Sequence, residues 1–157
     1  MAGKKFDIER YRDELIKVVK DNLNTKLADI NQEKGDGVYL RNIPTTSYYN
    51  DAHDNNITDK AYIYYGFVPI IPDDKGVPNA VNVTMFISVV FDNTNKKNTE
   101  TMVLRYTRAL KEVIEDNYKK FPSTSRLSVI QFVPEDFENN KGAEFKIGGV
   151  QVSASII

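Results

Sequence analysis

Two stretches of the chain repeat apolar residues at intervals of three and four, the spacing that predicts amphipathic helices. The first helix is expected at about residues 8–31, with Asp7 as its N-cap. The second is expected to begin at Asn98 or Thr99 and to end before Phe121. Each has a single apolar stripe and charged residues elsewhere, so we expect each helix to lie with that stripe against a flat surface.

Other stretches alternate apolar and other residues with a period of two, which predicts β-strands. The clearest covers residues 81–91, where one face is continuously apolar and the other begins polar and ends apolar. Residues 61–71 are apolar or aromatic on both faces, so we expect both faces to be covered. Residues 127–133 predict a further strand, and residues 38–44 are compatible with a short one. The segment 45–60 is rich in turn formers and is expected to be a loop.

The last fifteen residues, AEFKIGGVQVSASII, predict a β-hairpin with Gly148-Gly149 as a two-residue turn. Such a turn pairs three sets of apolar residues on one face, namely Ile147 with Val150, Phe145 with Val152, and Ala143 with Ala154. Agreement across three pairs favours this register. We expect the last strand to be paired and covered, either by its own sheet or by a neighbouring subunit.

The order of these elements predicts the fold class. Helices and strands do not alternate, so a doubly wound parallel sheet is not expected. We predict an α+β fold: a mostly antiparallel β-sheet, two amphipathic helices packed on one face, and a C-terminal β-hairpin. The length of 157 residues and the absence of linkers and repeats predict a single domain over residues 1–157.

Composition excludes several kinds of chemistry. The chain has no cysteine, which excludes disulfides, thiolate metal sites and a cysteine nucleophile. Its formal net charge of −1 gives no overall attraction to nucleic acid or to an anionic membrane. No apolar run is long enough to span a membrane, and the N-terminus lacks the apolar region of a secretory signal. We therefore expect synthesis in a cytoplasm and no membrane partner.

No motif predicts an active site. The single histidine, His53, lies between Asp51 and Asp54, but the spacing matches no metal-binding signature, and a solvated loop histidine is favoured. The sequence contains no Gly-x-Ser-x-Gly elbow and no phosphate-binding glycine pattern. We predict no catalytic residue, no cofactor and no metal, and do not expect an enzyme.

A protein interface is the favoured explanation for the remaining unusual features. Tyrosines are dense in the second quarter of the chain; they are able to stack on bases, but without a basic groove we favour core packing or a protein interface. The polar loops are long for so small a domain, and the last strand is apolar. The candidate subunit-interface residues are Tyr62, Tyr64, Lys96, Lys97, Val152, Ile156 and Ile157.

The layout as a whole resembles a known family. The matching parts are FDIERYRDELIKVVKDNL, VNVTMFISVVFDNT, TETMVLRYTRALKEVIEDN and AEFKIGGVQVSASI, in that order. Together they are similar to the tail terminator and tail-completion (neck) proteins of tailed bacteriophages. The likeness covers nearly the whole chain and is one of element order and texture. Residues 41–60 and 134–142 have no counterpart in it.

This resemblance implies a structural role. Such proteins form rings, usually hexameric, that cap the tail tube, stop its growth and provide the surface that joins it to the head or neck. It implies tail-tube and neck proteins as partners, DNA passing through the lumen without sequence-specific binding, and a place in the virion after synthesis in the host bacterial cytoplasm. The alternatives are another head–tail connector or tail-tube component and, from a different class, a small-molecule or nucleic-acid binding domain.

Overall fold

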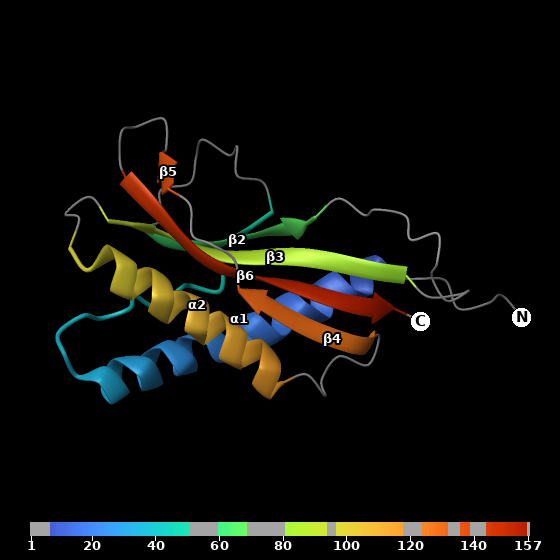
Figure 1. The fold of residues 1–157 in the computed structure, drawn as a ribbon, viewed down its shortest axis with the longest axis horizontal. Coiled ribbons are helices and arrows are strands. Elements are labelled where there is room, and N and C mark those ends of the chain that lie inside the picture. Colours follow the sequence, from blue (N-terminus) through green and yellow to red (C-terminus); the bar gives the residue numbers. More distant parts are fainter. Residues whose placement is uncertain are drawn as a thin grey trace, which may run out of the picture.

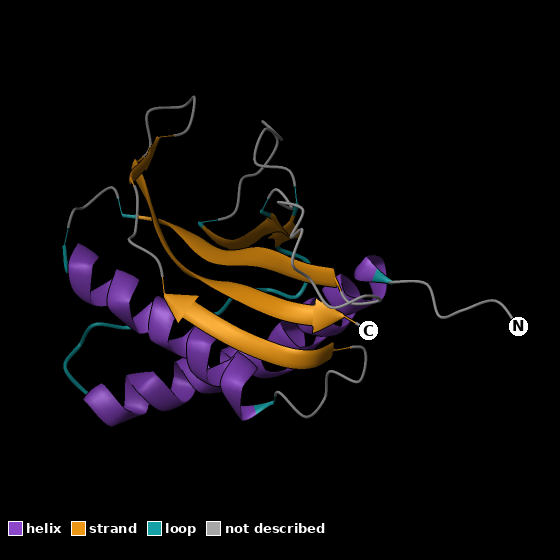
Figure 2. Cartoon of the chain, turned by 45° about the vertical axis from the view of Figure 1, so that its right-hand side comes forward, coloured by secondary structure: helices purple, strands orange, loops and turns teal. Residues whose placement is uncertain are grey.

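A layer of two helices lies against one face of a twisted sheet (Figures 1 and 2). This computed structural model describes residues 7–50, 60–68, 81–93, 97–117, 124–131, 136–138 and 144–156. The elements are α1 (Ile8–Lys34), β1 (Tyr48–Tyr49), β2 (Ala61–Phe67), β3 (Val81–Asp92), α2 (Thr99–Asp116), β4 (Thr124–Gln131), β5 (Asp136–Glu138) and β6 (Glu144–Ile156). The predicted α+β class, with a mostly antiparallel sheet and both helices on one face, is confirmed.

Both helices begin where local sequence places a cap. The Asp7 side chain accepts a hydrogen bond of 2.9 Å from the Arg10 backbone N–H, which confirms the predicted N-cap of α1. Helix α1 runs to Lys34 and not only to residue 31, because Gly35 is the residue that adopts the left-handed conformation ending it, with φ of 53°. Asn98, one of the two residues predicted to begin α2, occupies the N-cap position with φ of 57°, and its side chain makes no capping hydrogen bond.

The strand order is β1-β2-β3-β6-β4, with β5 pairing β6 beside this path. Among the described strands, β1 and β2 pair in parallel and the other neighbours are antiparallel. Strand β6 is central: β3 pairs with one of its edges, and β4 and β5 pair with the other (Figure 1). The last predicted strand is therefore paired within its own sheet. Strand β1 lies inside the predicted 45–60 loop and had no periodicity to reveal it.

The predicted hairpin is wrong. Gly148 and Gly149 lie inside the continuous strand β6 and pair with β3. A Cβ atom added to Gly148 would lie 2.7 Å from the Val103 carbonyl oxygen and 3.0 Å from Thr107 Oγ1, both on α2. Gly148 therefore permits α2 to approach β6 closely. Such a close approach requires glycine, as some tight turns do.

A continuous strand also changes the faces of its side chains. In a continuous strand, odd-numbered and even-numbered side chains point to opposite faces of the sheet. Phe145 and Ile147 therefore point to one face, and Val150 and Val152 point to the other. The prediction that Phe145 and Val152 share a face is therefore wrong. Val150, Val152 and Ala154 belong to the core under the helices, whereas Phe145 belongs to a second cluster on the other face.

The main core lies between the helices and the sheet. Strand β3 contributes every second residue from Val83 to Phe91, as its alternation predicted. Tyr11 of α1 is fully buried, and its hydroxyl donates a hydrogen bond of 3.2 Å to the Val152 carbonyl oxygen. Val152 itself is completely buried in this core. It is therefore a core residue and does not belong to an exposed subunit interface.

Candidate subunit interface

The face of the sheet opposite the helices carries a second apolar cluster. Tyr62, Val90 and Phe145 are buried there, with Tyr49, Tyr64 and Ile147 partly buried around them. We call these residues, together with Phe86, the aromatic cluster. Its residues come from β1, β2, β3 and β6. Strand pairing brings them together, since Tyr62 of β2 lies opposite Val90 of β3, and Val90 lies opposite Ile147 of β6.

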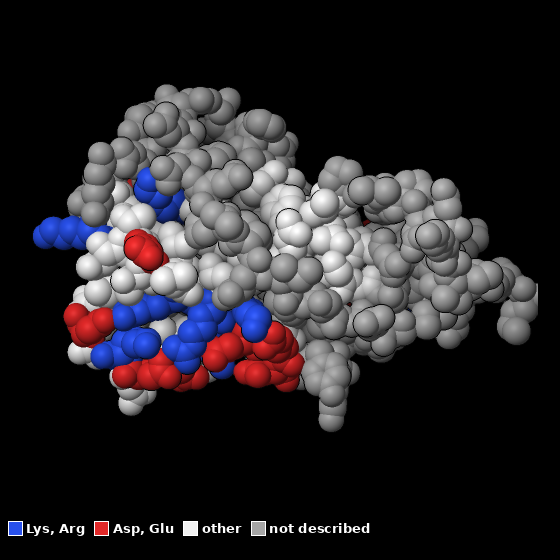
Figure 3. Space-filling view, viewed as in Figure 1, with Lys and Arg blue, Asp and Glu red and all other residues white. Residues whose placement is uncertain are grey.

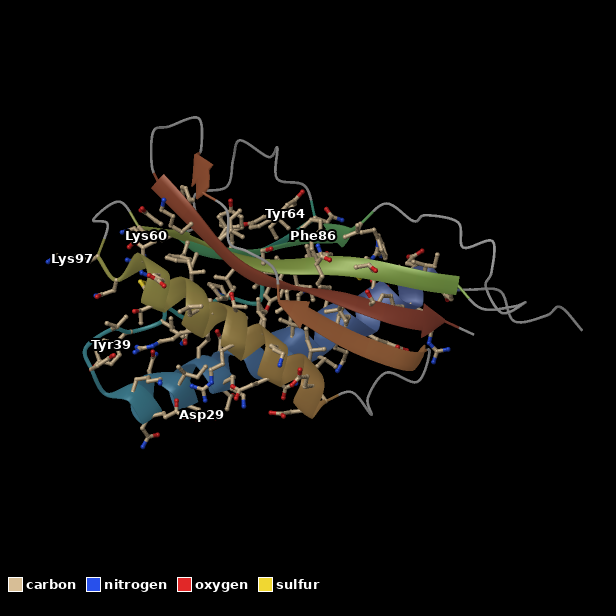
Figure 4. All side chains as sticks on the ribbon, in the orientation of Figure 1. Asp29, Tyr39, Lys60, Tyr64, Phe86 and Lys97 are labelled. Carbon is tan, nitrogen blue, oxygen red and sulfur yellow. The ribbon has the colours of Figure 1, made fainter. Side chains whose placement is uncertain are left out.

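The rings of the aromatic cluster meet in tilted and edge-on pairs. The ring centroids of Tyr49 and Tyr62 are 5.6 Å apart and nearly perpendicular, and those of Tyr62 and Phe145 are 6.2 Å apart. The rings of Tyr64 and Phe86 are 5.0 Å apart, and both side chains project on the side of the sheet away from the helices (Figure 4). Each such pair contributes about 0.5–1.5 kcal/mol beyond area burial.

Gly66 makes room for one of these rings. It lies opposite Phe86 in the β2–β3 register, and a Cβ atom added to it would be 3.0 Å from two atoms of the Phe86 ring. The Phe86 ring therefore lies over Gly66 and contacts the Tyr64 ring, so that the two rings form one aromatic surface on this face. Toward the end of β6 the same face is polar, since Thr84 Oγ1 and Ser153 Oγ are hydrogen-bonded at 2.8 Å.

The outer edge of β2 is only partly paired in the described structure. Strand β1 pairs with Ile63 and Tyr64, and the Ile63 N–H donates to the Ser47 carbonyl oxygen at 2.9 Å. Within the described residues, the β1 register stops there and does not extend along Tyr65 to Phe67. Phe67, at the end of β2, is 38% exposed.

On the opposite side of the molecule, the two helices present a charged surface (Figure 3). Arg108 on α2 binds Glu33 on α1 with contacts of 2.5 and 3.1 Å, and Lys26 on α1 binds Asp116 on α2 at 3.3 Å. The hydrogen bonds from Arg108 hold the pKa of the Glu33 carboxyl below its ordinary value. Positive and negative groups alternate on this surface and compensate one another.

Residues 36–43, which we call the strap, run back along the helices after α1 ends. The Asn31 side-chain amide donates to the Leu40 carbonyl at 3.1 Å and accepts from the Leu40 N–H at 2.8 Å. Asn24 holds the backbone of Ile43 in the same manner, at 2.8 and 2.7 Å. The two asparagines and their two partners are equally spaced, because the seven residues of helix from Asn24 to Asn31 and the three extended residues from Leu40 to Ile43 each span about 10 Å. The sequence is compatible with a short strand at residues 38–44, but the structure has no strand there. The strap takes its place, and its only sequence signal is two asparagines seven residues apart on one helix.

The start of the strap is tied to α2 by an ion pair. The Arg105 guanidinium, only 8% exposed as a residue, binds both carboxylate oxygens of Asp36 at 3.1 and 2.5 Å and donates to the Val38 carbonyl at 3.1 Å. These hydrogen bonds lower the pKa of Asp36 to about 2. Further along, the Tyr106 hydroxyl accepts from the Arg41 N–H at 2.9 Å, and burial raises its pKa to about 12.

The structure brings together only some of the candidate interface residues. Tyr62 and Tyr64 lie side by side in the aromatic cluster, whereas Lys97 is exposed before α2. The backbone of Ile156 pairs with β3 and β4, and its side chain is outside the described residues, as are Lys96 and Ile157. Asp51, His53 and Asp54 also lie outside the described residues.

The described ranges contain neither a cluster of metal ligands nor a membrane-spanning helix. No group of three or more His, Cys, Asp or Glu side chains is placed to hold a metal ion among the described residues. In the same part of the chain, neither helix is long and apolar enough to cross a membrane.

The geometry defines a class: an α+β protein with a helix layer on one face of a mostly antiparallel sheet and an aromatic cluster on the other. Comparison with known protein families found no family that matches the chain, and comparison with curated proteins found no significantly similar sequence.

Proposed function

We propose that this chain is a structural subunit of a tailed phage or phage-like particle that acts by self-assembly, as a tail terminator that caps the tail tube and joins it to the neck. The aromatic cluster is the observation that carries the proposal. Helices cover one face of the sheet, whereas the other face presents partly exposed Tyr49, Tyr64 and Phe86. Aromatic residues on a rigid, partly apolar surface are the composition of protein interfaces.

The two sides of the molecule suit different surroundings. The charged pairs across α1 and α2 are compensated within the chain, so the helix layer suits solvent. The aromatic cluster gains free energy when a neighbouring subunit covers it, and the part of the β2 edge that no described strand pairs offers backbone groups to the same neighbour. A net charge of −1 does not oppose a lumen through which DNA slides.

Assembly is tested with two matched variants, each of which adds one negative charge. Tyr64→Glu places the charge on the aromatic cluster, and Leu104→Glu places it on a side chain of α2 that is 58% exposed. We expect the wild type and Leu104→Glu to form rings of several copies in native mass spectrometry and electron microscopy. We expect Tyr64→Glu to remain monomeric, with an unchanged circular dichroism spectrum.

The result that contradicts self-assembly is a wild type that stays monomeric at high concentration. Rings that form equally well with Tyr64→Glu would show that assembly uses another surface. The terminator role is tested separately by adding the protein to growing tail tubes, where we expect one labelled ring at one end and tubes that stop lengthening. A ring found elsewhere along the tube would instead support a tail-tube component, and a ring bound only to neck proteins would support a connector.

The alternative from a different class is a small-molecule or nucleic-acid binding domain. The Tyr64–Phe86 pair is a surface on which a base is able to stack. Titration of the monomer with single-stranded oligonucleotides tests this alternative, which predicts saturable binding that Tyr64→Glu abolishes.

A further inference from the structure

The strap begins with the dipeptide Asp36-Gly37, and we infer that this dipeptide is a latent isomerisation site that Arg105 holds unreactive. This inference is independent of the proposed function. Asp-Gly is the dipeptide most prone to this reaction, because glycine places no side chain between its backbone nitrogen and the preceding carboxyl group. Gly37 has φ of 83° and nothing within 4 Å of the position a Cβ would occupy, so the surroundings leave the site open.

The reaction needs no other reagent than water. The Gly37 backbone nitrogen attacks the side-chain carboxyl carbon of Asp36, a C–N bond forms, and the acid hydroxyl leaves with the amide proton as water. The product is a five-membered succinimide. Water then opens the ring at either carbonyl, which restores aspartate or gives an isoaspartyl linkage whose main chain runs through Cβ. The first step requires the carboxyl group to be protonated, since hydroxyl leaves far more readily than oxide.

The structure blocks that first step through the carboxylate oxygens. Arg105 donates to Oδ1 at 3.1 Å and to Oδ2 at 2.5 Å, and the Val38 N–H donates to Oδ1 at 3.1 Å. Three donors therefore face a group with a side-chain exposure of 44%, which would otherwise be free to rotate and bind a proton. The low pKa of Asp36 agrees with this geometry. Arg105 is itself fixed by its bond to the Val38 carbonyl.

Isomerisation at this position would release the strap. An isoaspartyl linkage adds one carbon to the main chain at Asp36, immediately before Gly37, and converts the side-chain carboxyl group that Arg105 binds into the main-chain amide. The longer main chain would then shift Leu40 and Ile43 away from Asn31 and Asn24, whose side-chain amides hydrogen-bond their backbones. Both Leu40 and Ile43 are buried, so this shift exposes apolar surface.

The test compares the full-length wild type with Arg105→Met and Arg108→Met, held folded at mildly acidic pH and physiological temperature. Arg108→Met removes the neighbouring pair with Glu33 and leaves the bonds of Asp36 in place. Isoaspartate at residue 36 is measured by enzymatic methylation and by peptide mapping with electron-transfer fragmentation. We expect Arg105→Met to accumulate it about tenfold faster than the other two, because a carboxyl group that has lost both Arg105 donors binds a proton more readily.

Equal rates in Arg105→Met and the wild type would overturn the inference. A second comparison decides the matter if Arg105→Met fails to fold. The free peptide EKGDGVYL is aged beside the folded wild type, and the folded protein is expected to react at least about tenfold more slowly. A folded wild type that isomerises as fast as the peptide also overturns the inference.

Discussion

Substitution of Gly148 by alanine tests the reason given for the glycine in the middle of β6. The added Cβ would lie 2.7 Å from the Val103 carbonyl oxygen, whereas ordinary contacts begin at about 3.4 Å, and that oxygen belongs to the α2 backbone. Helix and strand must therefore separate by several tenths of an ångström. Overpacking of this kind costs about 1–3 kcal/mol, which for a chain of this length lowers Tm by roughly 2–12 °C.

The assay is thermal and guanidinium unfolding of the wild type, Gly148→Ala and Gln151→Ala. Gln151 lies in the same strand on the opposite, helix-free face, so its truncation is expected to change stability by no more than about 0.5 kcal/mol. The sign of the stability change in Gly148→Ala distinguishes the two possibilities. If no close approach existed, alanine would stabilise the protein by about 0.4–1 kcal/mol by restricting the unfolded chain. An unchanged or raised Tm for Gly148→Ala therefore refutes the explanation.

Three further substitutions test the strap and the core. Asn24→Ala leaves the backbone N–H and C=O of Ile43 without their partner, and is expected to lower the free energy of unfolding by about 1–3 kcal/mol in guanidinium titrations; a loss below about 0.5 kcal/mol would contradict the pairing. Because folding lowers the pKa of Asp36 to about 2, the stabilisation by Arg105 is complete above the unfolded-state pKa of about 3.9 and is lost as pH falls through about 2. The stability difference between the wild type and Arg105→Met should therefore shrink over that range, and a difference independent of pH would contradict the ion pair. Tyr11→Phe removes one hydrogen bond to the β6 backbone and is expected to cost about 0.5–1.5 kcal/mol with no change in secondary structure by circular dichroism.

The sequence alone determined the features that depend on neighbouring residues. The two helices follow from periodicity, and the start of α1 follows from the capping chemistry of Asp7, both of which act within one or two turns. The alternation in β3 likewise predicted its buried face, and the change of its other face from polar to apolar anticipated the contrast between Thr84 and Val90. These features gave the α+β class correctly.

Only the tertiary structure decided the features that depend on residues far apart in the chain. A Gly-Gly pair suits both a hairpin turn and a close approach to a helix, and the position of Val103 decided between them. That choice made β6 one central strand with apolar residues on both faces, and so joined Phe145 to Tyr62 in the aromatic cluster. The strap was equally hidden, because its partners are side-chain amides that carry no periodic signal. Local sequence patterns specify the helices and strands. Packing between distant parts of the chain decides which helices and strands contact one another.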